Sequence, residues 1–95
     1  MKLQLSPRAL EDLQSITAYS LQTWGEIQTD HYLDAIWEAL EEIRRCPDRF
    51  RLRQELAEGC RSALIGHHVI FFSANDERVA VIRILHSSMD FGQHL

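Results

Sequence analysis

An arginine, a histidine and an aspartate lie close together near the end of the chain, and side chains of these types bind charged groups or transfer protons. Arg83 interrupts a run of aliphatic residues, His86 follows that run, and Asp90 comes shortly after. Such an apolar run predicts a buried central strand, whose aliphatic residues are explained by packing alone. The three polar side chains are not needed for burial, so they are the first candidates for a functional role.

A second arginine extends this candidate site. Arg61 also falls in a predicted strand, from which it could project on the same face as Arg83. Two guanidinium groups placed in this way form a fork for a carboxylate or a phosphate. The alternative is that each arginine makes an ordinary ion pair with an acid at the sheet edge, Asp90 or Glu58.

The histidines do not have the spacing of a metal site. His67 and His68 are adjacent in a predicted strand, so their side chains point to opposite faces. His31, His86 and His94 lie at unrelated spacings. Because a structural zinc site needs about four converging ligands, we expect no metal, with one of the paired histidines packed in the sheet and the other exposed. No glycine-rich phosphate loop is present, and we expect no cofactor.

Charge is distributed unevenly along the chain. The net charge is −4, and residues 9–43 contain eight acids and no lysine or arginine, whereas residues 44–95 contain eight arginines and six acids. The acids of the first half are expected to face solvent, and the second half suits an anion or an acidic partner. Overall acidity argues against sequence-specific nucleic-acid binding. No apolar run approaches the length of a membrane span, and the first residues lack a signal peptide, so we expect a cytoplasmic protein with no membrane contact.

The first half predicts a short strand followed by two helices. Residues 2–5 alternate polar and apolar, and Ser6-Pro7 is a typical helix start. Trp24-Gly25 ends this helix, and Cys46-Pro47 ends the second one. Each helix carries one apolar stripe that we expect to face the core: Leu10, Leu13, Ile16, Leu21 and Trp24 in the first, and Ile27, Leu33, Ile36, Trp37, Leu40 and Ile43 in the second. A tight link between them makes an antiparallel helical hairpin.

The second half predicts an antiparallel meander. Residues 47–59 read as a loop with one short helical turn, and strands are expected over residues 60–65, 67–73 and 78–85. The resulting order is β-αα-βββ, a single α+β domain over residues 1–95, with the helical hairpin packed on one face of a small, mostly antiparallel sheet.

Two helices can cover only one face of that sheet. The strands around residues 69–72 and 79–85 are apolar on both alternating faces. We therefore expect one apolar face to be bare and to be covered by a partner chain.

Elements in this order resemble the ParE branch of the RelE/ParE toxin superfamily of bacterial type II toxin–antitoxin modules. The resemblance covers nearly the whole chain. It rests on the opening Leu5-Ser-Pro-Arg-Ala-Leu-Glu-Asp-Leu, on Tyr19 followed by Trp24-Gly25, on Gly59-Cys-Arg61 and Gly66-His-His-Val-Ile-Phe-Phe, and on the closing Ile82-Arg-Ile-Leu-His86 and Met89-Asp90.

The resemblance implies a toxin that a ParD-like antitoxin neutralises and that inhibits DNA gyrase by binding, without catalysis. The antitoxin would cover the bare sheet face at Val69, Phe71, Val81 and Ile84. The gyrase contact would use Arg61, Arg83, His86, Met89 and Asp90.

Relatives in the RelE branch imply an alternative, a ribosome-dependent endoribonuclease that cleaves messenger RNA. In that case Arg61 and Arg83 would hold a phosphate and His86 would transfer a proton. The absence of a tyrosine after His86 and the acidity of the domain favour gyrase instead. A third possibility is a binding module that has the toxin fold but has lost toxicity.

Overall fold

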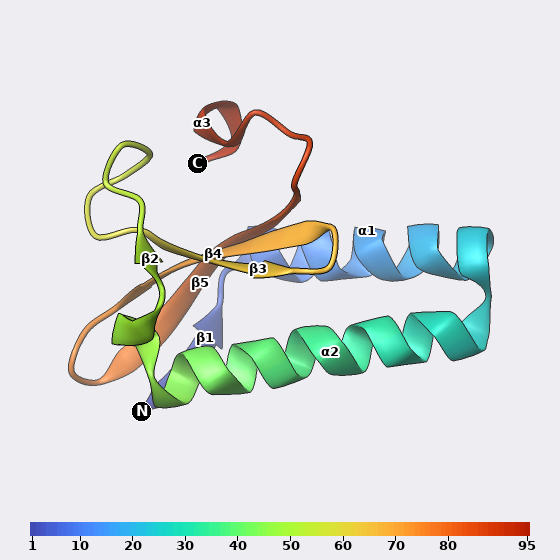
Figure 1. Cartoon of the computed structure of the whole chain (residues 1–95), viewed down its shortest axis with the longest axis horizontal. Coiled ribbons are helices and arrows are strands. Elements are labelled where there is room, and N and C mark those ends of the chain that lie inside the picture. The colour runs from blue at the N-terminus through green and yellow to red at the C-terminus, as the bar shows by residue number, and fades with distance from the viewer.

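The computed structural model describes residues 1–95, which form a five-stranded sheet with a helical hairpin packed on one face (Figure 1). The elements are β1 (Lys2–Leu5), α1 (Pro7–Trp24), α2 (Glu26–Arg45), the 3-10 turn η1 (Pro47–Arg49), β2 (Arg51–Leu52), β3 (Arg61–Ile65), β4 (His68–Ala74), β5 (Arg78–His86) and α3 (Phe91–His94). The predicted α+β class and the order β-αα-βββ are confirmed.

Both ends of α1 form as the sequence predicts. The Ser6 side chain accepts a hydrogen bond from the amide of Ala9 at 3.0 Å, and Pro7 occupies the first turn. Ser6 also donates to the carbonyl of Ile82 at 2.7 Å, so the same residue joins the helix start to β5. At the other end Gly25 has a φ of 85°, which favours glycine and lets the chain reverse directly into α2.

The strand order is β1-β5-β4-β3-β2. The three predicted strands pair antiparallel as a meander, and β1 joins its edge parallel to β5 through Lys2–Leu5 opposite Arg78–Val81. The sequence did not predict β2, a two-residue strand within the expected loop that pairs with Arg61 and Ser62. A strand of two residues is held by its pairing with β3, and it is too short to show a periodic pattern in the sequence.

The helical face of the sheet holds the larger core. It consists of Ala9, Leu13, Ile16, Ile36, Leu40, Ile43, Ala63, Ile70, Phe72, Val79, Val81 and Ile84. The predicted stripe of α1 was partly wrong, because Leu10, Leu21 and Trp24 are 49%, 45% and 47% exposed. The stripe that faces the sheet instead runs through Ala9, Leu13, Ile16 and Ser20. In α2, Ile27 and Trp37 were also assigned to the core and are 76% and 48% exposed.

The expectation of a bare sheet face was also wrong. Val69, Phe71 and Leu85 form a second buried cluster with Cys60, and Leu56, Phe91 and Leu95 pack against it. Figure 1 shows this cover, with the C-terminal segment folding back over the strands on the side opposite α2. Sequence periodicity missed it because the cover comes from single apolar residues in short, irregular segments.

The four residues assigned to the antitoxin contact therefore have little free surface. Val69 and Phe71 are 7% and 0% exposed beneath the C-terminal segment. Val81 and Ile84, at 1% and 2%, belong to the core under the helices and not to the same face. The four residues were grouped because both strands are apolar on both alternating faces, and the register irregularity between Phe71 and Phe72 places Val81 and Ile84 on one face of β5 although they are three residues apart.

Candidate functional site

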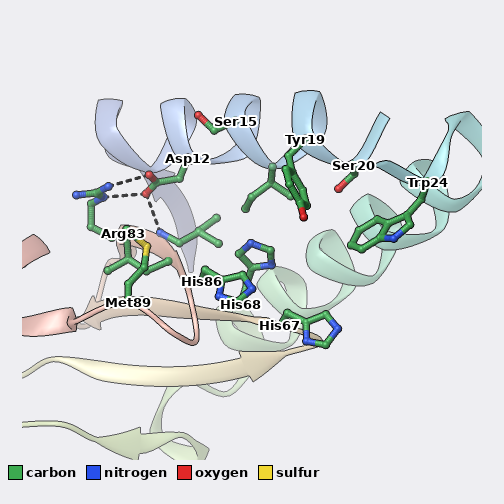
Figure 2. Close-up of a pocket in the computed structure, with 13 residues that line it drawn as sticks. Asp12, Ser15, Tyr19, Ser20, Trp24, His67, His68, Arg83, His86 and Met89 are labelled. Carbon is green, nitrogen blue, oxygen red and sulfur yellow. Dashed lines mark hydrogen bonds and ion pairs between the residues drawn. The ribbon is translucent and has the colours of Figure 1, made fainter. Parts of the chain in front are cut away.

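An open cleft of about 580 Å³ lies between α1 and the end of β5 (Figure 2). It forms here because β1 ends at Leu5, opposite Val81, so the remainder of β5 has α1 beside it in place of a strand. The lining residues are Asp12, Ser15, Ile16, Tyr19, Ser20, Trp24, His67, His68, Arg83, Ile84, Leu85, His86 and Met89.

One end of the cleft is closed by an ion pair between α1 and β5. Asp12 accepts two hydrogen bonds from the guanidinium of Arg83, at 2.8 and 2.9 Å, and a third from the amide of Ile84 at 2.9 Å (Figure 2). Both side chains are only 13% exposed, and the carboxylate of Asp12 raises the pKa of Arg83. Arg83 also donates to the carbonyl of His94 at 3.2 Å. The charge of Arg83 is therefore already neutralised within the chain.

Three imidazole rings form the floor of the cleft at its other end. His68 and His86 face each other across β4 and β5 with ring centroids 5.3 Å apart, and His67 stacks on His86 at 6.2 Å. Burial, and then the proximity of His86 and His67, lower the pKa of His68 to about 4. His68 is therefore neutral at neutral pH.

Tyr32, on α2, holds the partly buried imidazole of His68. Its hydroxyl lies 2.5 Å from Nδ1 of His68 and 3.2 Å from the carbonyl of Ile65, and it accepts a hydrogen bond from the amide of His67 at 3.1 Å. Burial raises the pKa of Tyr32. The hydroxyl thus fixes the β3–β4 turn and the ring of His68 to the helical hairpin. The expectation that one histidine of the pair is packed and the other exposed is confirmed, with His68 partly buried and His67 exposed.

The upper wall of the cleft is aromatic and exposed. Tyr19 and Trp24 meet edge to face with centroids 6.0 Å apart, and they are 62% and 47% exposed. Met89 is 37% exposed at the opposite side. Exposed aromatic and methionine side chains around a concave surface are typical of protein contacts.

The structure brings together part of the predicted site. Arg83, His86 and Met89 line the cleft, whereas Asp90 is exposed next to Met89 at the start of α3 and does not line it. Arg61 lies elsewhere on the sheet, where it donates to the carbonyl of Phe50 at 2.7 Å.

The predicted arginine fork was wrong. Arg61 pairs in register with Phe72, on the helical face, and Arg83 pairs with Phe71, on the other face. Their acidic partners are also not the expected ones, since Arg83 binds Asp12 and Arg61 lies 3.9 Å from Asp48. The sequence pattern placed both arginines in strands. It could not show the register irregularity between β4 and β5, which changes the face of the sheet on which Arg83 lies.

Sequence reasoning missed five residues of this region. Asp12 was grouped with the solvent-facing acids, Tyr19 was given no place in the site, Trp24 was assigned to the core, and Tyr32 and His68 were given no joint role. A signal for part of the set was present, because Asp12, Ile16 and Tyr19 follow one another at helical spacing and so share one side of α1. No group of three or more His, Cys, Asp or Glu side chains is arranged to hold a metal ion. None of the helices is long and apolar enough to cross a bilayer.

Comparisons with known proteins show the family of this chain. Residues 3–91 match the family described as ParE toxin of type II toxin-antitoxin system, parDE. The chain is 37% identical over 92 residues to Toxin ParE1 of Caulobacter vibrioides, covering 97% of this chain and 95% of the relative. It is 30% identical over 92 residues to Toxin ParE1 of Mycobacterium tuberculosis, covering 96% and 94%.

A solved structure described as "Chromosomal ParDE TA system from P. aeruginosa" has the same fold. Its TM-score is 0.79 at 17% identity, over 90% of this chain and 95% of that one. The match to the family and to both curated relatives extends over almost the whole length of the chain. This protein therefore belongs to the ParE toxin family of type II toxin–antitoxin systems.

Proposed function

We propose that this toxin inhibits DNA gyrase in the cytoplasm by binding, and that a ParD-like antitoxin neutralises it. Family membership supports the toxin role, and the solved ParDE structure with the same fold supports an antitoxin of the ParD type. The observation that carries the mode of action is the Asp12–Arg83 ion pair, which occupies the one cation of the cleft that a catalytic site would need free.

Inhibition without catalysis fits the chemistry of the cleft. A ribonuclease needs cations aimed at a phosphate together with a proton-transfer group. Arg83 is neutralised by Asp12, and Arg61 donates to the carbonyl of Phe50 on the opposite face. The remaining groups are three imidazoles, of which His68 is neutral, together with an aromatic wall and a methionine, which favour a protein contact.

The gyrase contact that we propose is centred on His86 and Met89, flanked by Tyr19 and Trp24. Asp90 is exposed beside Met89 and extends this surface. Arg83 lines the same cleft, where its hydrogen bonds to Asp12 and to the carbonyl of His94 hold it in place. Arg61 has the weakest support of the candidate residues, because it does not line the cleft.

The proposed antitoxin contact at Val69 and Phe71 requires a change in the toxin. Phe91 and Leu95 pack against these residues in the free chain. An antitoxin segment reaches them only by displacing the C-terminal residues, and Val81 and Ile84 remain under the helices even then.

The direct test is supercoiling by purified gyrase with increasing amounts of the toxin. We expect inhibition at micromolar concentration, and we expect the paired change His86→Ala and Met89→Ala to weaken it about tenfold or more, the effect of losing a contact at the centre of an interface. Leu64→Ala is the matched control, since Leu64 is 72% exposed on β3 and lies outside the cleft. Supercoiling that continues at a large excess of toxin would reject the proposal.

Expression of the toxin in bacterial cells without an antitoxin distinguishes the three candidate functions. A gyrase inhibitor arrests growth and induces the SOS response while messenger RNA stays intact. Cleaved messenger RNA after induction would indicate the endoribonuclease instead. Normal growth without antitoxin would indicate a binding module without toxicity.

A further inference from the structure

The ring of His86 is held in one orientation at the floor of the cleft. His67 stacks on it with the ring planes 13° apart and the centroids separated by 6.2 Å. His68 meets it edge to face, at an interplanar angle of 83° and with centroids 5.3 Å apart. His86 is nevertheless exposed and lines the cleft (Figure 2). An exposed side chain that its neighbours already fix loses little conformational entropy when it binds a partner.

One ring nitrogen of His86 is occupied within the chain. The backbone amide of Ser88 donates a hydrogen bond to Nδ1 of His86 at 3.1 Å, and the hydroxyl of the same serine lies 2.8 Å from that atom. A backbone amide can only donate, so Nδ1 must be the nitrogen that carries no proton in the neutral ring. The proton of neutral His86 is therefore on Nε2.

Nε2 of His86 has no partner in the chain, because both hydrogen bonds of this side chain are made through Nδ1. The Nε2–H group is thus a donor of fixed position in the cleft. A partner that covers it without an acceptor would leave a buried donor unsatisfied, which costs free energy. His67 differs, since neither of its ring nitrogens is hydrogen-bonded and nothing in the chain fixes which of them carries the proton.

The surroundings of His86 favour a neutral acceptor. Arg83 is the only arginine or lysine that lines the cleft, and it is already bound to Asp12. The carboxylate of Asp12 also lines the cleft, and the chain has a net charge of −4. A carboxylate of a partner would therefore approach an acidic protein and find its arginine neutralised. A carbonyl oxygen accepts from Nε2–H without this repulsion.

We propose that His86 recognises the target of the toxin as a hydrogen-bond donor, through Nε2–H to a neutral carbonyl oxygen, and that the amide of Ser88 sets the tautomer for this role. Apolar side chains beside that carbonyl would pack against the exposed Tyr19, Trp24 and Met89. The inference rests on the proposed binding of gyrase at the cleft, but the tautomer can be measured without gyrase.

The tautomer is measured by long-range proton–nitrogen correlation NMR on toxin with isotope-labelled histidine, at about pH 8, where an ordinary imidazole is neutral. The signal of His86 is assigned by its loss in His86→Gln. We expect a single Nε2–H form for His86 and an averaged mixture of the two forms for His31, which is exposed and makes no side-chain hydrogen bond. The Nδ1–H form, or the same mixture as His31, would overturn the assignment.

Three substitutions of His86 separate the donor from the ring. His86→Gln places an amide N–H near the position of Nε2, His86→Asn ends near the position of Nδ1, and His86→Phe keeps a stacking ring without a donor. In supercoiling assays we expect His86→Gln to keep the concentration for half-maximal inhibition within about threefold, and the other two changes to raise it about tenfold.

His31 provides matched controls for these changes. His31→Gln and His31→Asn alter an exposed histidine on α2 outside the cleft in the same way, and they should leave inhibition unchanged. His86 is also exposed, so circular dichroism should show a folded protein for every variant.

Salt dependence distinguishes a neutral acceptor from a carboxylate. Binding of the unmodified toxin and of His86→Phe to purified gyrase is measured by titration calorimetry at about 0.05 and 0.2 M salt, which changes the screening length of charges about twofold. We expect the ratio of the two affinities to be the same at both concentrations. A ratio that falls as salt rises would make the acceptor a carboxylate and overturn the neutral carbonyl.

Two further results would overturn the donor role while leaving gyrase as the target. The first is inhibition by His86→Gln as weak as that by His86→Phe, and the second is inhibition by His86→Phe as strong as that by the unmodified toxin. If the unmodified toxin itself did not inhibit gyrase, the proposed function would fail and the donor role with it. A single Nε2–H form in the NMR spectrum would still confirm the tautomer of His86 in that case.

Discussion

Asp12 joins three segments that are distant in sequence. Its carboxylate binds the guanidinium of Arg83 and the amide of Ile84 on β5, and Arg83 in turn holds the carbonyl of His94 in the C-terminal segment. A single acid on α1 therefore fixes the helix, the central part of β5 and the end of the chain relative to one another.

Removing this carboxylate should be costly. We expect Asp12→Ala to lower the free energy of unfolding by about 2–3 kcal/mol, because it leaves a mostly buried guanidinium and a strand amide without their partner. Urea denaturation measures the change. Glu11→Ala is the matched control, since Glu11 is exposed and makes no ion pair, and it should change stability by no more than about 0.5 kcal/mol. Equal effects of the two substitutions would contradict the role assigned to Asp12.

His68 makes stability depend on pH in the acidic range. Its pKa is lowered to about 4 in the folded protein, chiefly by burial, whereas the pKa of this side chain in the unfolded chain has the ordinary value of about 6.5. The unfolded state therefore binds more protons than the folded state between these values. The contribution of neutral His68 is complete above about pH 6.5 and is lost as the pH falls toward about 4.

We expect this group to remove about 2 kcal/mol of stability between pH 7 and pH 4, after a discount for its partial exposure to solvent. His68→Phe should flatten that part of the pH profile, measured by urea denaturation at a series of pH values. Tyr32 keeps a partner in this variant, since its hydroxyl also reaches the carbonyl of Ile65. His31→Gln, a change at an exposed histidine, should keep the slope of the unmodified protein.

At the scale of elements, the β3–β4 turn depends on a glycine for two reasons. Gly66 has a φ of 57°, and a Cβ there would lie 2.5 Å from Cε1 of Tyr32. Gly59 has a φ of 73° but no atom within 4 Å of the corresponding position. We expect Gly59→Ala to cost about 1 kcal/mol from backbone strain, and Gly66→Ala to cost about 1–3 kcal/mol more from the added clash. Thermal or urea unfolding of the two variants measures the difference, and equal losses would show that Tyr32 moves aside freely.

The C-terminal segment takes the place that we had assigned to a partner chain. The ring of Phe91 meets Phe71 edge to face with centroids 4.8 Å apart, and Arg53 lies 5.8 Å from the centroid of the Phe91 ring. Phe91→Ala should expose Phe71, lower the free energy of unfolding by about 1–2 kcal/mol, and increase binding of a hydrophobic dye. Gln93→Ala changes an exposed residue of the same segment and should alter neither measurement. An unchanged dye signal in Phe91→Ala would mean that the segment is not the cover.

The elements themselves were predictable because their signals are local. Ser6-Pro7 and Gly25 set the limits of α1, and the aliphatic run set β5. Which stripe of α1 faces the sheet was not predictable, because Leu10 and Leu13 are equally apolar in the sequence. The choice depends on how the helix rotates against the sheet, which only tertiary packing decides.

The candidate site was predictable only where its residues are neighbours in sequence. Arg83, His86 and Met89 were found together because they follow one strand. Asp12, Tyr32 and His68 were missed because they belong to three separate elements, with Asp12 and His68 lining the cleft and Tyr32 binding His68 from α2. The misplacement of Arg61 has a different cause, since the irregularity between Phe71 and Phe72 reverses the expected side-chain alternation.

At the scale of the whole molecule, α1 connects the core to the cleft. One stripe of α1 packs on the sheet through Ala9, Leu13 and Ile16, while Asp12 and Tyr19 line the cleft. The cleft combines an ion pair with exposed aromatic side chains, and the exposed His86 and Met89 also line it. The side chains that fill the core and the side chains exposed in the cleft are therefore different residues.

This arrangement predicts that gyrase inhibition and stability can be separated by substitution. His86→Ala with Met89→Ala should raise the toxin concentration needed for half-maximal gyrase inhibition about tenfold or more, yet change the free energy of unfolding by no more than about 1 kcal/mol, because both side chains are exposed. Leu64→Ala, a change at an exposed residue outside the cleft, should alter neither quantity. Supercoiling assays and urea denaturation of the same preparations make the comparison. If the double variant lost inhibition only together with its fold, His86 and Met89 would belong to the structural core of the protein and not to a contact surface.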